Sequence, residues 1–128
     1  MPYKTFPLIS CAIALLLASI SAQAATTSYT CKFVLEASPK GVSKPDKPFN
    51  LSFIVDTTTK KAYLVGNAGS SEVEIIPNRD GISFVEITGT GNVMVTAITK
   101  AGDAVHSRNG IMFKELIPSQ FYGNCVVQ

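Results

Sequence analysis

The feature of this sequence that most limits its possible folds is a repeated alternation of apolar and polar residues with a period of two. From Tyr29 to Glu36, apolar side chains at odd positions alternate with largely polar ones, and the pattern recurs in Leu51–Asp56 and Glu72–Ile76. Successive side chains of a strand point to opposite faces, so this period predicts strands that turn one face toward a core. No window carries the three- and four-residue spacing of an amphipathic helix, and we expect no long helix.

Composition supports the same fold class. From residue 25 onward the chain contains 29 valine, isoleucine and threonine residues, against four leucines and seven alanines. β-Branched residues favour strands, whereas leucine and alanine favour helices. We therefore predict an all-β fold.

Clusters of glycine, asparagine, aspartate and serine divide the chain into short segments. Asn109-Gly110 is expected to form a two-residue hairpin turn, because both residues tolerate a positive φ. Short strands joined by tight turns are typical of antiparallel neighbours, which predicts a small up-and-down barrel or sandwich of about eight strands. The strands are expected near 28–36, 49–56, 60–66, 72–77, 81–88, 92–99, 103–108, 110–114 and 121–127.

The first 24 residues have the layout of a cleaved secretory signal peptide. Lys4 supplies a positive charge, Cys11–Ile20 form an apolar run, and residues 22–24 (A-Q-A) form a small-x-small cleavage site. A spanning helix needs roughly 20 apolar residues, so no stable membrane span is expected. We predict that residues 1–24 are removed and that 25–128 form a single β domain, periplasmic or secreted.

Export would place the two remaining cysteines in an oxidising compartment. Cys31 and Cys125 lie 94 positions apart and form an even pair, so a disulfide between them is expected to close the fold. Closing a loop of that length contributes about 4–5 kcal/mol in the chain-entropy model. A redox-active pair is disfavoured, because the Cys-x-x-Cys spacing is absent.

The charges and side chains available argue against several classes of function. Residues 25–128 carry 10 basic and 9 acidic side chains, a balance that does not favour a nucleic-acid partner. The single histidine and the absence of a Gly-x-Ser-x-Gly elbow disfavour a hydrolytic triad. No ligand spacing typical of a metal site or phosphate cradle is present. We therefore predict a protein that is not an enzyme and carries no metal or cofactor.

Three side chains near the C-terminus are candidates for contacts with a partner. His106 and Arg108 lie beside the expected hairpin turn, where a surface or hairpin-stabilising position is the main expectation for His106 and recognition the alternative. Tyr122 lies on the face of the last strand opposite Cys125, which is expected to point inward. Gly123 is expected to leave space for a ring across the strand pair.

Two longer segments are also candidates. The strands expected at 81–88 and 92–99 are apolar on both faces, which indicates either coverage by a loop or curling sheet, or an apolar patch for a partner. Ala37–Pro48 is rich in proline and lysine and is expected to be a mobile loop, either solvated or in cationic contact with a partner.

Two family resemblances add expectations. His106-Ser107-Arg108 together with the ending Ser119–Cys125 resembles a group of small exported bacterial β-proteins that are uncharacterised. The opening Tyr29-Thr30-Cys31 and the ending Asn124-Cys125 are similar to periplasmic inhibitors of C-type lysozyme.

The lysozyme inhibitors carry Ser-Gly-Ser-Gly-x-x-Tyr and Tyr-x-x-x-Thr-Lys-Gly motifs, whose loops enter the lysozyme cleft. The nearest matches here are residues 88–91 (T-G-T-G), followed by Met94 where the motif has tyrosine, and 99–102 (T-K-A-G). This resemblance implies that Thr99 and Lys100 contact lysozyme.

Together these observations predict a binding or inhibitor module without catalysis, with lysozyme as one candidate partner. The alternative is a structural or assembly protein of the bacterial envelope. The sequence leaves open which protein or small molecule is bound and what the oligomeric state is.

Overall fold

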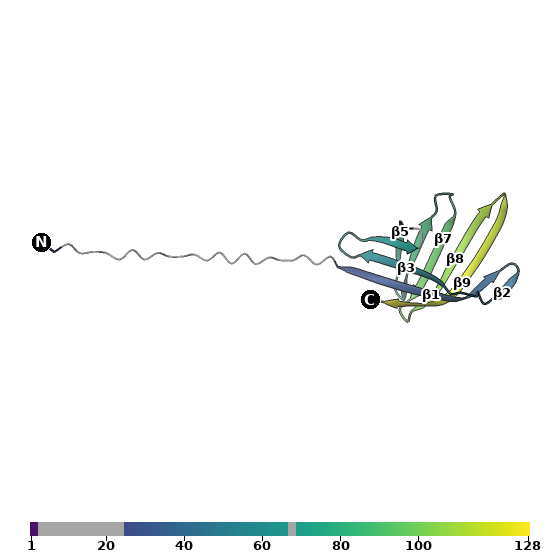
Figure 1. Cartoon of the computed structure of the whole chain (residues 1–128), viewed down its shortest axis with the longest axis horizontal. Helices are drawn as coiled ribbons and strands as arrows, with labels where there is room; N and C mark the ends of the chain where they lie inside the picture. Colours follow the sequence, from purple (N-terminus) through teal and green to yellow (C-terminus); the bar gives the residue numbers. More distant parts are fainter. Residues whose placement is uncertain (3–24, 67–68) are drawn as a thin grey trace.

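The computed structural model describes residues 1–2, 25–66 and 69–128, so most of the expected signal peptide lies outside the described residues. The described chain is all-β, as predicted, and contains strands but no helix (Figure 1). The strands are β1 (Thr26–Ser38), β2 (Gly41–Ser43), β3 (Phe49–Asp56), β4 (Lys61–Gly66), β5 (Gly69–Asn78), β6 (Gly81–Ile87), β7 (Val93–Thr99), β8 (Asp103–Met112) and β9 (Glu115–Val127).

Eight of these strands form a closed antiparallel barrel. Neighbours pair in the order β1-β3-β4-β5-β6-β7-β8-β9, and β9 pairs back onto β1. The short β2 pairs with the C-terminal end of β1. This closure decides between the two expected architectures, in favour of the barrel. Cys31 and Cys125 face each other in the β1–β9 pair and are joined by the expected disulfide. The bond therefore lies across the seam where the barrel closes.

The interior is filled by side chains at alternate strand positions, as the period of two predicts. The rings of Phe53 and Phe84 stack with centroids 4.3 Å apart, and Tyr29 meets Phe84 edge-on. An eight-stranded barrel is just wide enough for side chains to fill it. The buried apolar residues are Cys31, Phe33, Leu51, Phe53, Val55, Ala62, Leu64, Val73, Phe84, Ile98, Ala104, Phe121 and Cys125.

A β-bulge in β1 changes which residues face inward. The register shifts between Phe33 and Leu35, so that Leu35 pairs with the outward Tyr122 and Glu36 pairs with the inward Phe121. The expectation that Leu35 shares the inner face with Phe33 is therefore wrong, and Leu35 is 38 % exposed. An extra residue in one strand flips the side chains that follow it.

Gly123 lies opposite Phe33, next to this bulge. A Cβ at Gly123 would overlap the carbonyl oxygen of Lys32 and approach Cα of Phe33 to 2.6 Å. The glycine thus makes room for the backbone of β1, and not for a ring as expected.

The last hairpin differs most from the expectation. β8 continues through Asn109-Gly110, and the turn is at Phe113-Lys114, with φ angles of 51° and 68°. The predicted turn at Asn109-Gly110 is therefore wrong, and the strands expected at 103–108 and 110–114 are one strand. Cross-strand pairing up to Met112 and Glu115 overrides the local turn preference of Asn109-Gly110.

The expected loop at Ala37–Pro48 is in part a hairpin. β2 pairs with the end of β1, and the N–H of Lys40 donates to Oγ of Ser38 in the turn. Residues 44–48 connect β2 to β3, with a bend at Asp46-Lys47.

Strand direction places the connections at two ends of the barrel. The turns after β3, β5 and β7 lie at one end together with Gln128, whose backbone bonds Ser28. The β1–β2, β6–β7 and β8–β9 connections lie at the other end, which we call the hairpin end. Figure 1 shows the β8–β9 hairpin on the side of the barrel away from the C-terminus.

Candidate functional site

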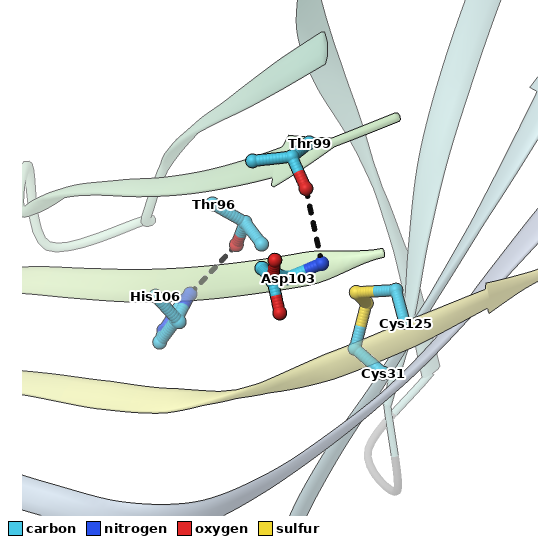
Figure 2. Close-up of a disulfide and its surroundings, with 6 residues drawn as sticks. All are labelled: Cys31, Thr96, Thr99, Asp103, His106 and Cys125. Carbon is cyan, nitrogen blue, oxygen red and sulfur yellow. Dashed lines mark hydrogen bonds between the residues drawn. A yellow bond between two sulfur atoms is a disulfide. The ribbon is translucent and has the colours of Figure 1, made fainter. Parts of the chain in front are cut away.

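Two predicted site residues, His106 and Arg108, lie together in the barrel near the hairpin end. Nδ1 of His106 is 2.7 Å from Oγ1 of Thr96 (Figure 2), and Nε of Arg108 donates to Nε2 of His106 at 3.2 Å. Since Arg108 is a donor, Nε2 must accept, and the imidazole proton is on Nδ1, donated to Thr96. Both ring nitrogens of His106 are therefore occupied.

His106 is only 2 % exposed, so the expected surface position is wrong. Burial, assisted by the charge of Arg108, lowers the pKa of His106 from 6.5 to about 4. The imidazole is therefore neutral near pH 7. Ser107 faces the outer wall, where its Oγ accepts a hydrogen bond from Gln120, so it cannot act with His106.

The guanidinium of Arg108 lies over two aromatic rings. Its Cζ is 4.6 Å from the ring centroid of Phe49 and 4.9 Å from that of Phe121. Burial lowers the pKa of Arg108, and the charges of Glu36 and Glu86 oppose that shift. Such cation–π contacts hold a planar cation in place.

Glu36 and Glu86 complete a charged group at the mouth of the barrel. Glu36 faces inward because of the bulge in β1, and Glu86 accepts a hydrogen bond from Ser71 at 3.2 Å. In the described part of the chain, no ion pair within 4.0 Å involves Arg108, so both carboxylates act on it at longer range. With two carboxylates, one guanidinium and a neutral imidazole, this arrangement fixes side chains and offers no activated nucleophile.

The other predicted site residues lie elsewhere. Thr99 and Lys100 are in the β7–β8 turn at the opposite end of the barrel, where Oγ1 of Thr99 accepts from the N–H of Asp103 at 3.1 Å (Figure 2). The backbone N–H of Lys100 donates to the carbonyl of Asp80, and its side chain is exposed. Thr99 thus stabilises the turn, while Lys100 is free to contact a partner.

Tyr122 is on the outer wall, 40 % exposed, and its hydroxyl donates to Oε1 of Gln120 at 2.6 Å. It borders a shallow hollow of about 450 Å³ over the outer faces of β6 to β9, which Thr99 also borders. The five predicted site residues therefore form two separate groups: His106 with Arg108 inside the barrel, and Thr99, Lys100 and Tyr122 outside it.

The two-faced central strands are β6 and β7. Phe84 and Ile98 fill the interior, while Ile87 and Val93 on the outer wall are 71 % and 39 % exposed. The central strands therefore expose apolar side chains at this edge of the wall, and contact with a partner there remains an expectation.

A cluster of strongly exposed apolar side chains lies at the tip of the β8–β9 hairpin. This cluster was not predicted as a site from the sequence. Phe113 is 92 % exposed and Leu116 77 %. We call residues 111–117 the apolar hairpin. A signal was present in the consecutive, non-alternating apolar residues on both sides of Lys114-Glu115, which do not fit a half-buried strand. The exposed members are Ile111, Met112, Phe113, Leu116 and Ile117.

Comparisons with protein-family models, with curated proteins and with solved structures found no match. The two family resemblances therefore remain expectations. The described residues include no helix of the length and apolarity needed to cross a membrane. The Cys31–Cys125 disulfide fits a compartment outside the reducing cytoplasm.

Proposed function

We propose that this chain is a binding or inhibitor module that performs no catalysis and contacts its partner with the outside of the barrel. The observation that carries the proposal is the apolar hairpin, whose tip residue Phe113 is almost fully exposed. Contiguous exposed apolar side chains are typical of interaction sites, since burying them on contact is favourable.

The packed interior supports an external contact. Barrels that bind a small ligand inside keep part of the lumen free of side chains. Here Phe33, Phe53 and Phe84 are at most 2 % exposed and occupy the centre of the barrel. The His106–Thr96 pair occupies the space toward the hairpin end.

The signal-peptide layout and the disulfide together support a periplasmic or secreted location for this module. A lysozyme-type target is the inhibitor form of the proposal, and exposed Lys100 is the side chain that would carry it. Inhibition is tested with purified C-type lysozyme, comparing the unaltered protein with Lys100→Ala. An inhibitor that acts through Lys100 loses potency in this variant, and absence of inhibition by the unaltered protein overturns this form alone.

The general proposal is tested by photo-crosslinking. A photoreactive phenylalanine analogue replaces Phe113 in the protein in its own cell envelope, and the matched control carries it at Tyr63, an outward aromatic position on β4. We expect a specific adduct, whether protein or lipid, from position 113 and not from position 63. Equal or absent labelling at the two positions would overturn the proposal.

A second candidate, an assembly protein of the envelope, is favoured by the exposed Ile87 and Val93 on the outer wall. These residues would bury apolar area between copies of the chain. Sedimentation equilibrium over a range of concentrations tests it: association that is lost in Ile87→Ser supports assembly, and a monomer at all concentrations contradicts it.

A further inference from the structure

The apolar hairpin is the end of a ribbon that extends beyond its neighbouring strands. The β7–β8 pairing ends at Val93 and Asn109, and the β1–β9 pairing ends at Ala37 and Gln120. In the sheet, residues 110–117 therefore pair only with one another, and the N–H of Ile111 also donates to Oδ1 of Asn92 in the β6–β7 connection. Figure 1 shows this hairpin at the end of β8 and β9, at the yellow-green end of the colour scale.

This ribbon is apolar on both faces and at its tip. Ile111 and Leu116 are paired on one face, Met112 and Ile117 lie on the other, and Phe113 forms the tip. All five side chains are between 49 % and 92 % exposed. A groove on a protein would cover one face of the ribbon, whereas the interfacial layer of a lipid bilayer surrounds an inserted element on all sides.

The turn itself holds a large apolar side chain where local energetics disfavour it. Phe113 and Lys114 both have positive φ, as a two-residue hairpin turn requires. Asparagine and glycine adopt this conformation at low cost, but a bulky residue there is unusual and strained. Phe113 is also the most exposed of the described aromatic residues. Because the fold gains little from a strained and exposed side chain, this position points to a contact of Phe113 outside the chain.

The surroundings of the hairpin are cationic. Lys114 follows Phe113 in the turn, and exposed Lys40, Lys44 and Lys47 lie on and after the β1–β2 hairpin. Residues 37–39 and 118–120 line one small hollow, so the turn of the β1–β2 hairpin lies beside the base of the β8–β9 hairpin. Allowing for Asp46 and Glu115, segments 37–48 and 110–119 carry a net charge of +2.

From these observations we propose that the apolar hairpin inserts into the interfacial layer of a membrane that contains anionic phospholipid, with the lysines at the headgroups. This inference rests on the proposed binding function and names its partner. Basic residues next to an apolar insertion favour anionic lipid surfaces.

The dimensions of the ribbon agree with shallow insertion. Three residues from Ile111 to Phe113 at about 3.4 Å per residue reach roughly 7–10 Å, close to the ~5–10 Å depth of interfacial elements. The N–H of Ile111 donates to Asn92, but the edges of the ribbon have no strand partner, and such backbone groups prevent deeper entry into hydrocarbon. Glu115 pairs with Met112 and Lys114 shares the turn with Phe113, so both charged side chains must extend along the ribbon to the headgroups, which also limits the depth of insertion.

The test uses tryptophan fluorescence, because the chain contains no tryptophan. Phe113→Trp is compared with Tyr63→Trp, both in the disulfide-bonded protein mixed with phosphatidylcholine vesicles with or without phosphatidylglycerol. We expect a blue shift and quenching by brominated lipid for Phe113→Trp with phosphatidylglycerol vesicles, and neither for Tyr63→Trp. An unchanged Phe113→Trp spectrum overturns the inference, and an equal response to both vesicle types overturns its anionic part.

Vesicle flotation of Phe113→Asn provides a second measurement. Asparagine fits the positive φ of the turn, so this variant keeps the fold while losing the apolar tip. We expect its binding to phosphatidylglycerol vesicles to fall roughly tenfold or more, and binding equal to that of the unaltered protein contradicts insertion. A protein adduct at position 113 without vesicle binding overturns the lipid inference and leaves the proposed function standing, while no adduct and no binding overturn both.

Discussion

His106 and Thr96 form a buried polar pair on neighbouring strands, with Nδ1 of the imidazole 2.7 Å from Oγ1 of the threonine. Nε2 of the same ring accepts from Arg108, so the network requires a neutral imidazole. Protonating Nε2 would break the bond to Arg108 and place two positive charges in contact. The pair is therefore stable only while His106 is uncharged.

We expect the free energy of unfolding to decrease as the pH falls from 6.5 toward 4. The pKa of His106 is about 4 in the folded protein, against 6.5 for a histidine free of these contacts, as in the unfolded chain. Between these values the unfolded chain binds a proton that the folded protein does not, so stability rises with pH and is complete above 6.5. At 1.36 kcal/mol per pKa unit, the effect is about 3 kcal/mol. Urea unfolding followed by circular dichroism over this pH range measures it.

The control for this prediction is His106→Asn, which keeps an N–H donor near Thr96 but does not titrate. Its stability should be lower overall and should not change with pH between about 5 and 6.5. Hydrogen bonds from the N–H groups of Thr59 and Thr58 lower the pKa of Asp56 below 3.8, so Asp56 adds a loss of stability only as the pH falls from about 5 toward 4. The same pH slope in His106→Asn would show that another group is responsible.

The local pattern predicts the inner wall of the barrel but not its closure. Leu51, Phe53 and Val55 point inward, as predicted, because alternation is a local property of a strand. Closure depends on the pairing of β1 with β9, which lie at opposite ends of the chain, and no local pattern encodes it.

The candidate site was predictable only in part, for similar reasons. His106 and Arg108 were both expected beside a hairpin turn, and their spacing of two on one strand, which places them on the same face, is the local signal that they meet. Glu36 was not expected beside Arg108, because the bulge that turns it inward arises from tertiary pairing. The turn at Phe113-Lys114 was missed because neither residue favours a positive φ, and strand pairing imposes it.

Removing the Cys31–Cys125 disulfide should destabilise the protein strongly. The bond spans 94 residues and closes the β1–β9 seam. Its loss gives the unfolded chain more conformational entropy, which lowers the free energy of unfolding by about 4–5 kcal/mol in the chain-entropy model. Urea unfolding of the Cys31→Ser/Cys125→Ser variant, compared with the oxidised protein, measures the difference. A loss below about 1 kcal/mol would mean that strand pairing alone secures the seam.

Gly123→Ala should cost more stability than Gly89→Ala. The added Cβ would overlap the Lys32 carbonyl, so the β1–β9 pair must separate near the bulge. We expect a loss of about 3 kcal/mol or more in the free energy of unfolding. Gly89→Ala is the matched control, because a Cβ there meets nothing within 4 Å and φ is not positive. Similar unfolding midpoints for the two variants would contradict the tight contact at Gly123.

Phe113→Asn should make the isolated protein more stable, although the wild-type side chain is far larger. Phe113 is 92 % exposed, so replacing it removes little buried apolar area from the folded protein. Asparagine relieves the cost of holding a bulky residue at φ 51°, which is on the order of 1 kcal/mol. Thermal unfolding of the two proteins without lipid measures the gain, and Lys60→Asn, at φ 59° in the β3–β4 turn, gives the corresponding effect at a turn outside the apolar hairpin. A lower melting temperature for Phe113→Asn would mean that Phe113 stabilises the fold, and would remove the strain argument for an external partner.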